Sequence, residues 1–146
     1  IANVSFKENG IRKAHDICIA NMALNPLAME MGLPFDENGY LAKQGVVNPQ
    51  LLWKLQELDF GNRSLGNEQY QEFFLPILKK STSIAETKIA TVTEYIAQKI
   101  SESLPPKSKV LSLAPRPICK AGPIRSRLAT KPPASVVEIV PETTLW

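Results

Sequence analysis

Nucleophilic and metal-binding side chains are scarce in this sequence. It has one histidine, His15, and two cysteines, Cys18 and Cys119, that are far apart in the chain. Two distant cysteines make no disulfide framework, so a reducing compartment is expected. His15 and Cys18 would share one helix face, but no third group is marked to orient them, and a buried cysteine on an apolar stripe is the commoner arrangement. With Cys119 they make only three zinc ligands without motif spacing, so we expect no metal and no cofactor.

Glycine-rich loops and long apolar runs are missing as well. The seven glycines form no dinucleotide or phosphate-binding loop and no nucleophile elbow. No stretch approaches the ~20 apolar residues of a membrane span. The turn at residues 36–39 lacks the remaining ligands of a calcium loop, and the acidic residues form no acid–base pair. These absences favour a protein that is not an enzyme, has no catalytic residues and binds no small molecule.

Proline and charge are distributed unevenly along the chain. Residues 104–146 hold eight of the twelve prolines and carry a net charge of +5, whereas residues 1–103 carry −2. No helix of normal length fits between those prolines. The sequence therefore predicts two parts: a helical head domain over residues 1–103, and an extended, basic, Pro-rich arm over residues 104–146.

Local signals predict four to six helices in the head domain. Apolar residues three and four positions apart predict a helix over residues 11–24. Two Asn-Pro pairs each resemble an N-cap followed by proline at the first helical position, and they predict helices over residues 26–31 and 49–58. Gly32 follows the first of these helices and is suited to a left-handed C-terminal cap. The Asp36–Gly39 segment has the composition of a turn.

The second half of the head domain gives the clearest helix. Asn67 is a candidate cap for an aromatic helical segment that Pro76 kinks or interrupts. Residues 84–103 contain no glycine or proline, and Ser83 and Glu86 stand in capping-box spacing. One apolar stripe of this helix comprises Ala85, Ile89, Val92, Ile96 and Ile100, and Thr91 is assigned to the polar side. The fold class expected is mainly α, with at most short edge strands in the arm.

Small aliphatic clusters alternate with cations and prolines in the arm. Each cluster is suited to a shallow groove on a partner, and residues 136–140 are suited to pairing with an exposed sheet edge. Forty-three residues at ~3.1 Å each span ~130 Å in polyproline form, far beyond the ~30–35 Å diameter of the head. The predicted partner-docking residues are Val110, Leu111, Leu113, Ile118, Val136, Val137, Ile139 and Trp146.

The cations of the arm are candidates for contact with phosphates or an acidic protein surface. The arm has no aromatic residue before Trp146, so base stacking has little support and only non-specific phosphate contact is expected. The residues predicted to make these contacts are Lys107, Lys109, Arg116, Lys120, Arg125, Arg127 and Lys131.

These observations favour a structural or interaction subunit of a larger assembly, of the capsid, cement or adaptor type. Its arm would dock on neighbouring copies or on other protein subunits, in the cytoplasm or in a virus particle. The alternative is a nucleic-acid-binding or packaging accessory protein whose basic arm contacts phosphates. A third hypothesis is an enzyme that uses Cys18 as its nucleophile.

Overall fold

The computed structural model describes residues 1–61, 64–104, 109–113 and 136–140. Within these residues the protein is mostly helical with one β-hairpin, which confirms the predicted fold class. The elements are β1 (Ala2–Glu8), β2 (Ile11–Cys18), α1 (Asn21–Met29), the 3-10 helix η1 (Glu37–Gly39), α2 (Tyr40–Gln44), α3 (Pro49–Gln56), α4 (Asn67–Gln69), the π-helix η2 (Tyr70–Phe74), α5 (Leu75–Lys80), α6 (Ala85–Ser103), β3 (Lys109–Leu113) and β4 (Val136–Val140).

The predicted helix over residues 11–24 is wrong, because its first part is a strand. β1 and β2 pair in antiparallel fashion from Glu8↔Ile11 to Ala2↔Cys18. The connecting residues Asn9 and Gly10 have positive φ angles of 52° and 80°, as a tight Asn-Gly hairpin turn requires. The residues with helical spacing span a strand, a short connection and the start of α1, and pairing with β1 determines the conformation of the first of these.

Helix α1 begins earlier than predicted and ends at Met29, two residues before the predicted end. It starts at Asn21 and continues through Pro26, so the helix start expected at Asn25-Pro26 is wrong. The predicted cap at Gly32 is confirmed by its φ of 78°. The amide of Leu33 donates to the carbonyl of Ala28 at 3.1 Å, which is the long hydrogen bond of a Schellman motif.

The second Asn-Pro helix start is confirmed at α3. The side-chain oxygen of Asn48 accepts hydrogen bonds from the amides of Gln50 (2.9 Å) and Leu51 (3.1 Å). The amide of Asn48 donates to Thr91 Oγ1 at 2.9 Å, and its Nδ2 donates to Ser83 Oγ at 2.9 Å. Asn48, predicted as a cap from local chemistry, therefore also joins α3 to α6.

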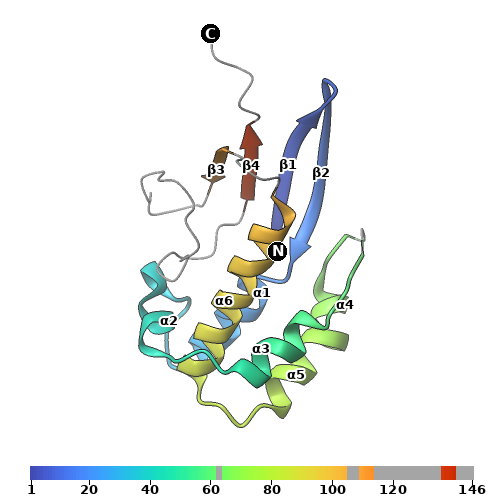
Figure 1. Ribbon diagram of the computed structural model, residues 1–146. Helices are drawn as coiled ribbons and strands as arrows, with labels where there is room; N and C mark the ends of the chain where they lie inside the picture. Colours follow the sequence, from blue (N-terminus) through green and yellow to red (C-terminus); the bar gives the residue numbers. More distant parts are fainter. Residues whose placement is uncertain (62–63, 105–108, 114–135, 141–146) are drawn as a thin grey trace.

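Helix α6 lies among the other helices and carries much of the core (Figure 1). Its predicted extent is confirmed to within one residue, although Ile84 is the N-cap and makes no side-chain capping bond. Thr91, assigned to the polar side, is fully buried and donates to the Thr87 carbonyl at 2.6 Å. The buried apolar residues of α6 are Ile89, Ala90, Val92, Tyr95, Ile96 and Ile100.

The interruption predicted at Pro76 is present as a change of helix type. Residues Tyr70–Phe74 form the π-helix η2, and α5 follows from Leu75. Proline has no amide hydrogen, and its ring crowds the carbonyl four residues earlier, so the α-helical pattern cannot pass through it unchanged.

The described strands form one four-stranded sheet in the order β2-β1-β4-β3. β4 pairs in parallel with β1 at Val4↔Val137 and Ser5↔Glu138, and β3 pairs with β4 in antiparallel fashion. In Figure 1 the hairpin stands beside α6 with its turn at the end remote from α1. The division into a head domain and an arm at residue 104 stays a prediction.

Candidate functional site

The residues predicted to dock partners or contact phosphates fall partly outside the described chain. Lys109, Val110, Leu111 and Leu113 lie in β3, and Val136, Val137 and Ile139 lie in β4. Their predicted roles stay predictions. The others lie outside the described residues: Lys107, Arg116, Ile118, Lys120, Arg125, Arg127, Lys131 and Trp146.

Cys18 is a core residue and not a nucleophile. It ends β2, is fully buried, and belongs to the main apolar cluster. Burial raises the pKa of its thiol to about 12, so almost none is thiolate at neutral pH. His15 lies on the same strand, is exposed, and makes an edge contact with Phe6 at a ring-centroid distance of 6.1 Å. The hypothesis of an enzyme based on Cys18 is therefore wrong.

The burial of Cys18 predicts a thiol that does not react in the folded protein. In a Cys119→Ser variant, a maleimide at neutral pH should label Cys18 very slowly in the native state and rapidly in guanidinium chloride. Mass spectrometry measures both rates. Native labelling as fast as that of a small free thiol would contradict the burial of Cys18.

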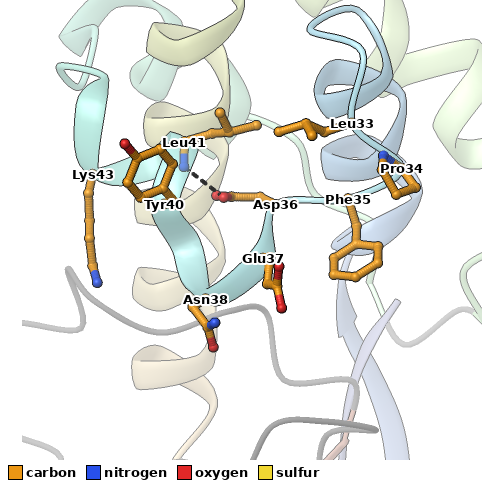
Figure 2. Close-up of a pocket in the computed structure, with 9 residues that line it drawn as sticks. All are labelled: Leu33, Pro34, Phe35, Asp36, Glu37, Asn38, Tyr40, Leu41 and Lys43. Carbon is orange, nitrogen blue, oxygen red and sulfur yellow. Dashed lines mark hydrogen bonds between the residues drawn. The ribbon is translucent and has the colours of Figure 1, made fainter.

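Asp36 is the buried carboxylate of the loop before α2, and its function is structural. One oxygen accepts from the amide of Leu41 at 2.7 Å, and the other accepts from the amide of Ala42 at 3.0 Å. Figure 2 shows Asp36 turned toward Leu41 within a shallow cavity of about 360 Å³. Both oxygens bind the backbone at the start of α2, which explains the burial of Asp36 by a structural role.

Asp16 is a more suitable carboxylate for a reaction. It lies near the end of β2, and its Oδ2 accepts from the amide of Leu65 at 2.8 Å and from Ser64 Oγ at 3.4 Å. Both hydrogen bonds end on Oδ2, and Oδ1 accepts no hydrogen bond among the residues that the structure describes. The side chain is therefore held in place by a distant loop through one of its two oxygens.

A β-bulge shapes the strand end beside Asp16. Ala2 pairs with Cys18 and Asn3 with Asp16, so Ile17 is an extra residue on β2. Such a bulge breaks the strict alternation of faces and redirects neighbouring side chains, and bulges are common beside active sites. Three residues after Cys18 the chain enters α1 at Asn21, whose side-chain oxygen is buried without a hydrogen-bond partner in the described structure.

Asp16 and the 64–65 segment together form the candidate site. It combines a carboxylate whose Oδ2 accepts from the Leu65 amide with the hydroxyl of Ser64. A carboxylate held in this way is suited to the transfer of a proton. The site is not evident in the sequence, because only the fold brings Asp16 to a segment almost fifty residues later.

Comparison with known proteins places the chain in a class of phosphotransferases. Residues 1–120 match the family model of anhydro-N-acetylmuramic acid kinase, so the chain belongs to this kinase family. It is 34% identical over 93 residues to the anhydro-N-acetylmuramic acid kinase of Bacillus cereus. That match covers 58% of this chain and 23% of the relative, so the chain spans about a quarter of the relative's length. No solved structure matches the chain.

This membership corrects the leading functional predictions. The expectation of a non-enzymatic structural or virion subunit is wrong, as are the alternative of a nucleic-acid-binding accessory and the expectation that the protein binds no small molecule. The prediction that the partners are protein subunits or nucleic acid is likewise wrong. In the part of the chain that the structure describes, no helix is long and apolar enough to cross a membrane.

Proposed function

We propose that this chain is part of a kinase that transfers a phosphoryl group from ATP to anhydro-N-acetylmuramic acid. The observation that carries the proposal is the family match over residues 1–120, which takes in every described helix and the β1–β2 hairpin. The free, buried thiol of Cys18 accords with a cytoplasmic location, where thiols stay reduced and ATP is available.

Asp16 is the residue of this chain that we assign to the chemistry. A kinase contributes mainly positioning and charge stabilisation, together with a carboxylate that orients the attacking hydroxyl and accepts its proton. Oδ2 of Asp16 is occupied by the Leu65 amide, and Oδ1 would accept the proton of the sugar hydroxyl. The contact with Leu65 fixes the carboxylate, so that the hydroxyl meets a base already in position.

A chimera tests this proposal. Residues 1–104 of this chain replace the matching segment of the Bacillus cereus protein, and phosphoryl transfer from radiolabelled ATP to anhydro-N-acetylmuramic acid is followed by chromatography. We expect turnover above that of a control in which the segment is deleted. A chimera that melts cooperatively, yet phosphorylates the sugar no faster than the deletion control, would overturn the assignment.

A further inference from the structure

The register of the β1–β2 hairpin places one further polar side chain beside Asp16, that of Asn3. The two residues are direct partners in the antiparallel pair. Directly opposite side chains lie on the same face of a sheet, with their Cβ atoms about 4.5–5.5 Å apart. Asn3 is only partly buried, although its neighbours Ala2 and Val4 are fully buried. The hairpin therefore presents an amide next to the carboxylate of the candidate site.

The amide of Asn3 contributes nothing to the fold through hydrogen bonds. Its side chain makes none within the described part of the chain, and the carboxylate opposite accepts from Leu65 and Ser64 instead. Neither polar atom of Asn3 is among the buried atoms without a partner, so both reach the surface. Asparagine is also depleted in strands. Strand formation therefore does not explain this residue, and its amide is accessible to a ligand.

A sugar hydroxyl complements the two side chains. A carboxylate only accepts hydrogen bonds and an amide NH₂ only donates them, whereas a hydroxyl does both. A hydroxyl oxygen that bonds to both groups at about 2.8–3.0 Å bridges a separation of the size expected between opposite side chains. With its proton directed to Asp16 and one lone pair engaged by Asn3, the oxygen keeps its second lone pair for the attack on phosphorus.

We propose that Asn3 orients the sugar hydroxyl that receives the phosphoryl group, by donating a hydrogen bond from Nδ2 to the hydroxyl oxygen. That oxygen forms a bond to the γ-phosphorus of ATP, and its proton passes to Oδ1 of Asp16. The bond from the γ-phosphorus to the bridging oxygen breaks, and ADP leaves with that electron pair. This inference rests on the proposed kinase function and deepens it, because it assigns the alignment of the attacking oxygen to Asn3.

The test compares Asn3→Val with Ser5→Val in the chimera. Ser5 lies two residues further along β1 on the same face, is also partly buried, and pairs with Ala14. Valine suits a strand, so neither substitution should disturb the hairpin. Asn3→Val should lower kcat/KM for the sugar about tenfold, as the loss of one hydrogen bond predicts, and leave the KM for ATP unchanged. Ser5→Val should stay within about twofold of the parent chimera.

A double-mutant cycle with Asp16→Asn shows whether the two side chains act on the same hydroxyl. If they do, Asn3→Val should lower kcat/KM by about threefold or less in the Asp16→Asn background, because residues that share a partner are not additive. An equal loss in both backgrounds would overturn the inference. An unchanged kcat/KM in Asn3→Val would do the same.

Stability and binding measurements keep this inference separate from the kinase proposal. In the 146-residue chain, Asn3→Val should melt no lower than Ser5→Val; a lower melting temperature would show a structural role and overturn the inference. If the chimera turns over no sugar, the kinase proposal fails, and calorimetric titration with the sugar alone decides about Asn3. A weaker Kd in Asn3→Val than in the parent would then support contact with the sugar, and an equal Kd would refute it. A chimera that binds no sugar overturns both proposals.

Discussion

Asp16→Asn in the chimera is expected to reduce phosphoryl transfer by about 10²–10⁴-fold, the usual contribution of a positioned general base. Asparagine keeps the size of the side chain, and its oxygen still accepts the hydrogen bond that the Leu65 amide makes in the parent at 2.8 Å. The loss is confined to the oxygen that would accept the proton of the sugar hydroxyl. We therefore expect a lower kcat with little change in the KM for ATP or for the sugar.

Asp59→Asn is the matched control for this substitution. Asp59 also accepts a backbone hydrogen bond, from the amide of Gly61 at 2.8 Å, but it lies in an exposed loop. Asp59→Asn removes the same charge at a residue outside the candidate site. The kcat of this variant should therefore stay within about twofold of that of the parent chimera, a change of under ~0.5 kcal/mol in the activation free energy. If both variants lost kcat equally, or if Asp16→Asn lost none, Asp16 would be shown to take no part in the chemical step.

The sequence predicted those elements whose conformation depends on neighbours in the chain. Asn48 caps α3 through the amides two and three residues later. Gly32 ends α1 because its own φ of 78° is one that glycine adopts without strain. Helix α6 was evident from an apolar stripe uninterrupted by glycine or proline. Each of these signals acts within about four residues, which is the range over which local patterns are informative.

The hairpin was missed because strand pairing is not a local property. The Asn9-Gly10 pair was the available signal, since its positive φ angles suit a two-residue turn between strands. The helix predicted over residues 11–24 instead places Gly10 directly before a helix. The approximate three- and four-residue spacing of Ala14, Ile17 and Cys18 suits a helix. Ala14 and Cys18 pair with β1 instead, and Ile17 is the extra residue of the bulge, because tertiary contacts override such spacing.

The function was mispredicted because composition describes how a chain makes contacts and not which reaction it supports. The prolines and cations of residues 104–146 favour docking, and the absence of a glycine-rich loop argues against an enzyme, but neither feature identifies a reaction. Phosphoryl transfer needs positioned groups more than a particular local motif. Asp16 becomes significant only through Leu65, a contact between residues 49 positions apart that no spacing rule predicts.

Gly45→Ala is expected to lower the free energy of unfolding by about 3 kcal/mol, at the upper end of overpacking effects. A Cβ at residue 45 would lie 2.1 Å from the carbonyl oxygen of Glu86, 2.5 Å from its carbon, and 2.9 Å from the Cβ of Ala90. Two of these atoms are backbone of α6, so no side-chain rotation relieves the clash. The φ and ψ of Gly45, −81° and 160°, suit any residue, so the expected cost is entirely steric.

The large loss of stability expected for Gly45→Ala reflects the contacts that depend on the close approach of Gly45 to α6. Gly45 ends α2 against α6, and three residues later Asn48 donates its amide to the buried Thr91 hydroxyl of the same helix. Separating the 45–48 segment from α6 would weaken that hydrogen bond as well as the packing. The melting temperature, followed by circular dichroism, should fall by roughly 10–20 °C in a domain of this size. Gly66→Ala is the matched control, because its added Cβ would meet nothing nearer than 3.6 Å. If Gly45→Ala melted within about 2 °C of this control, the two variants would differ in stability by only a few tenths of a kcal/mol. That result would mean that α2 and α6 do not approach so closely.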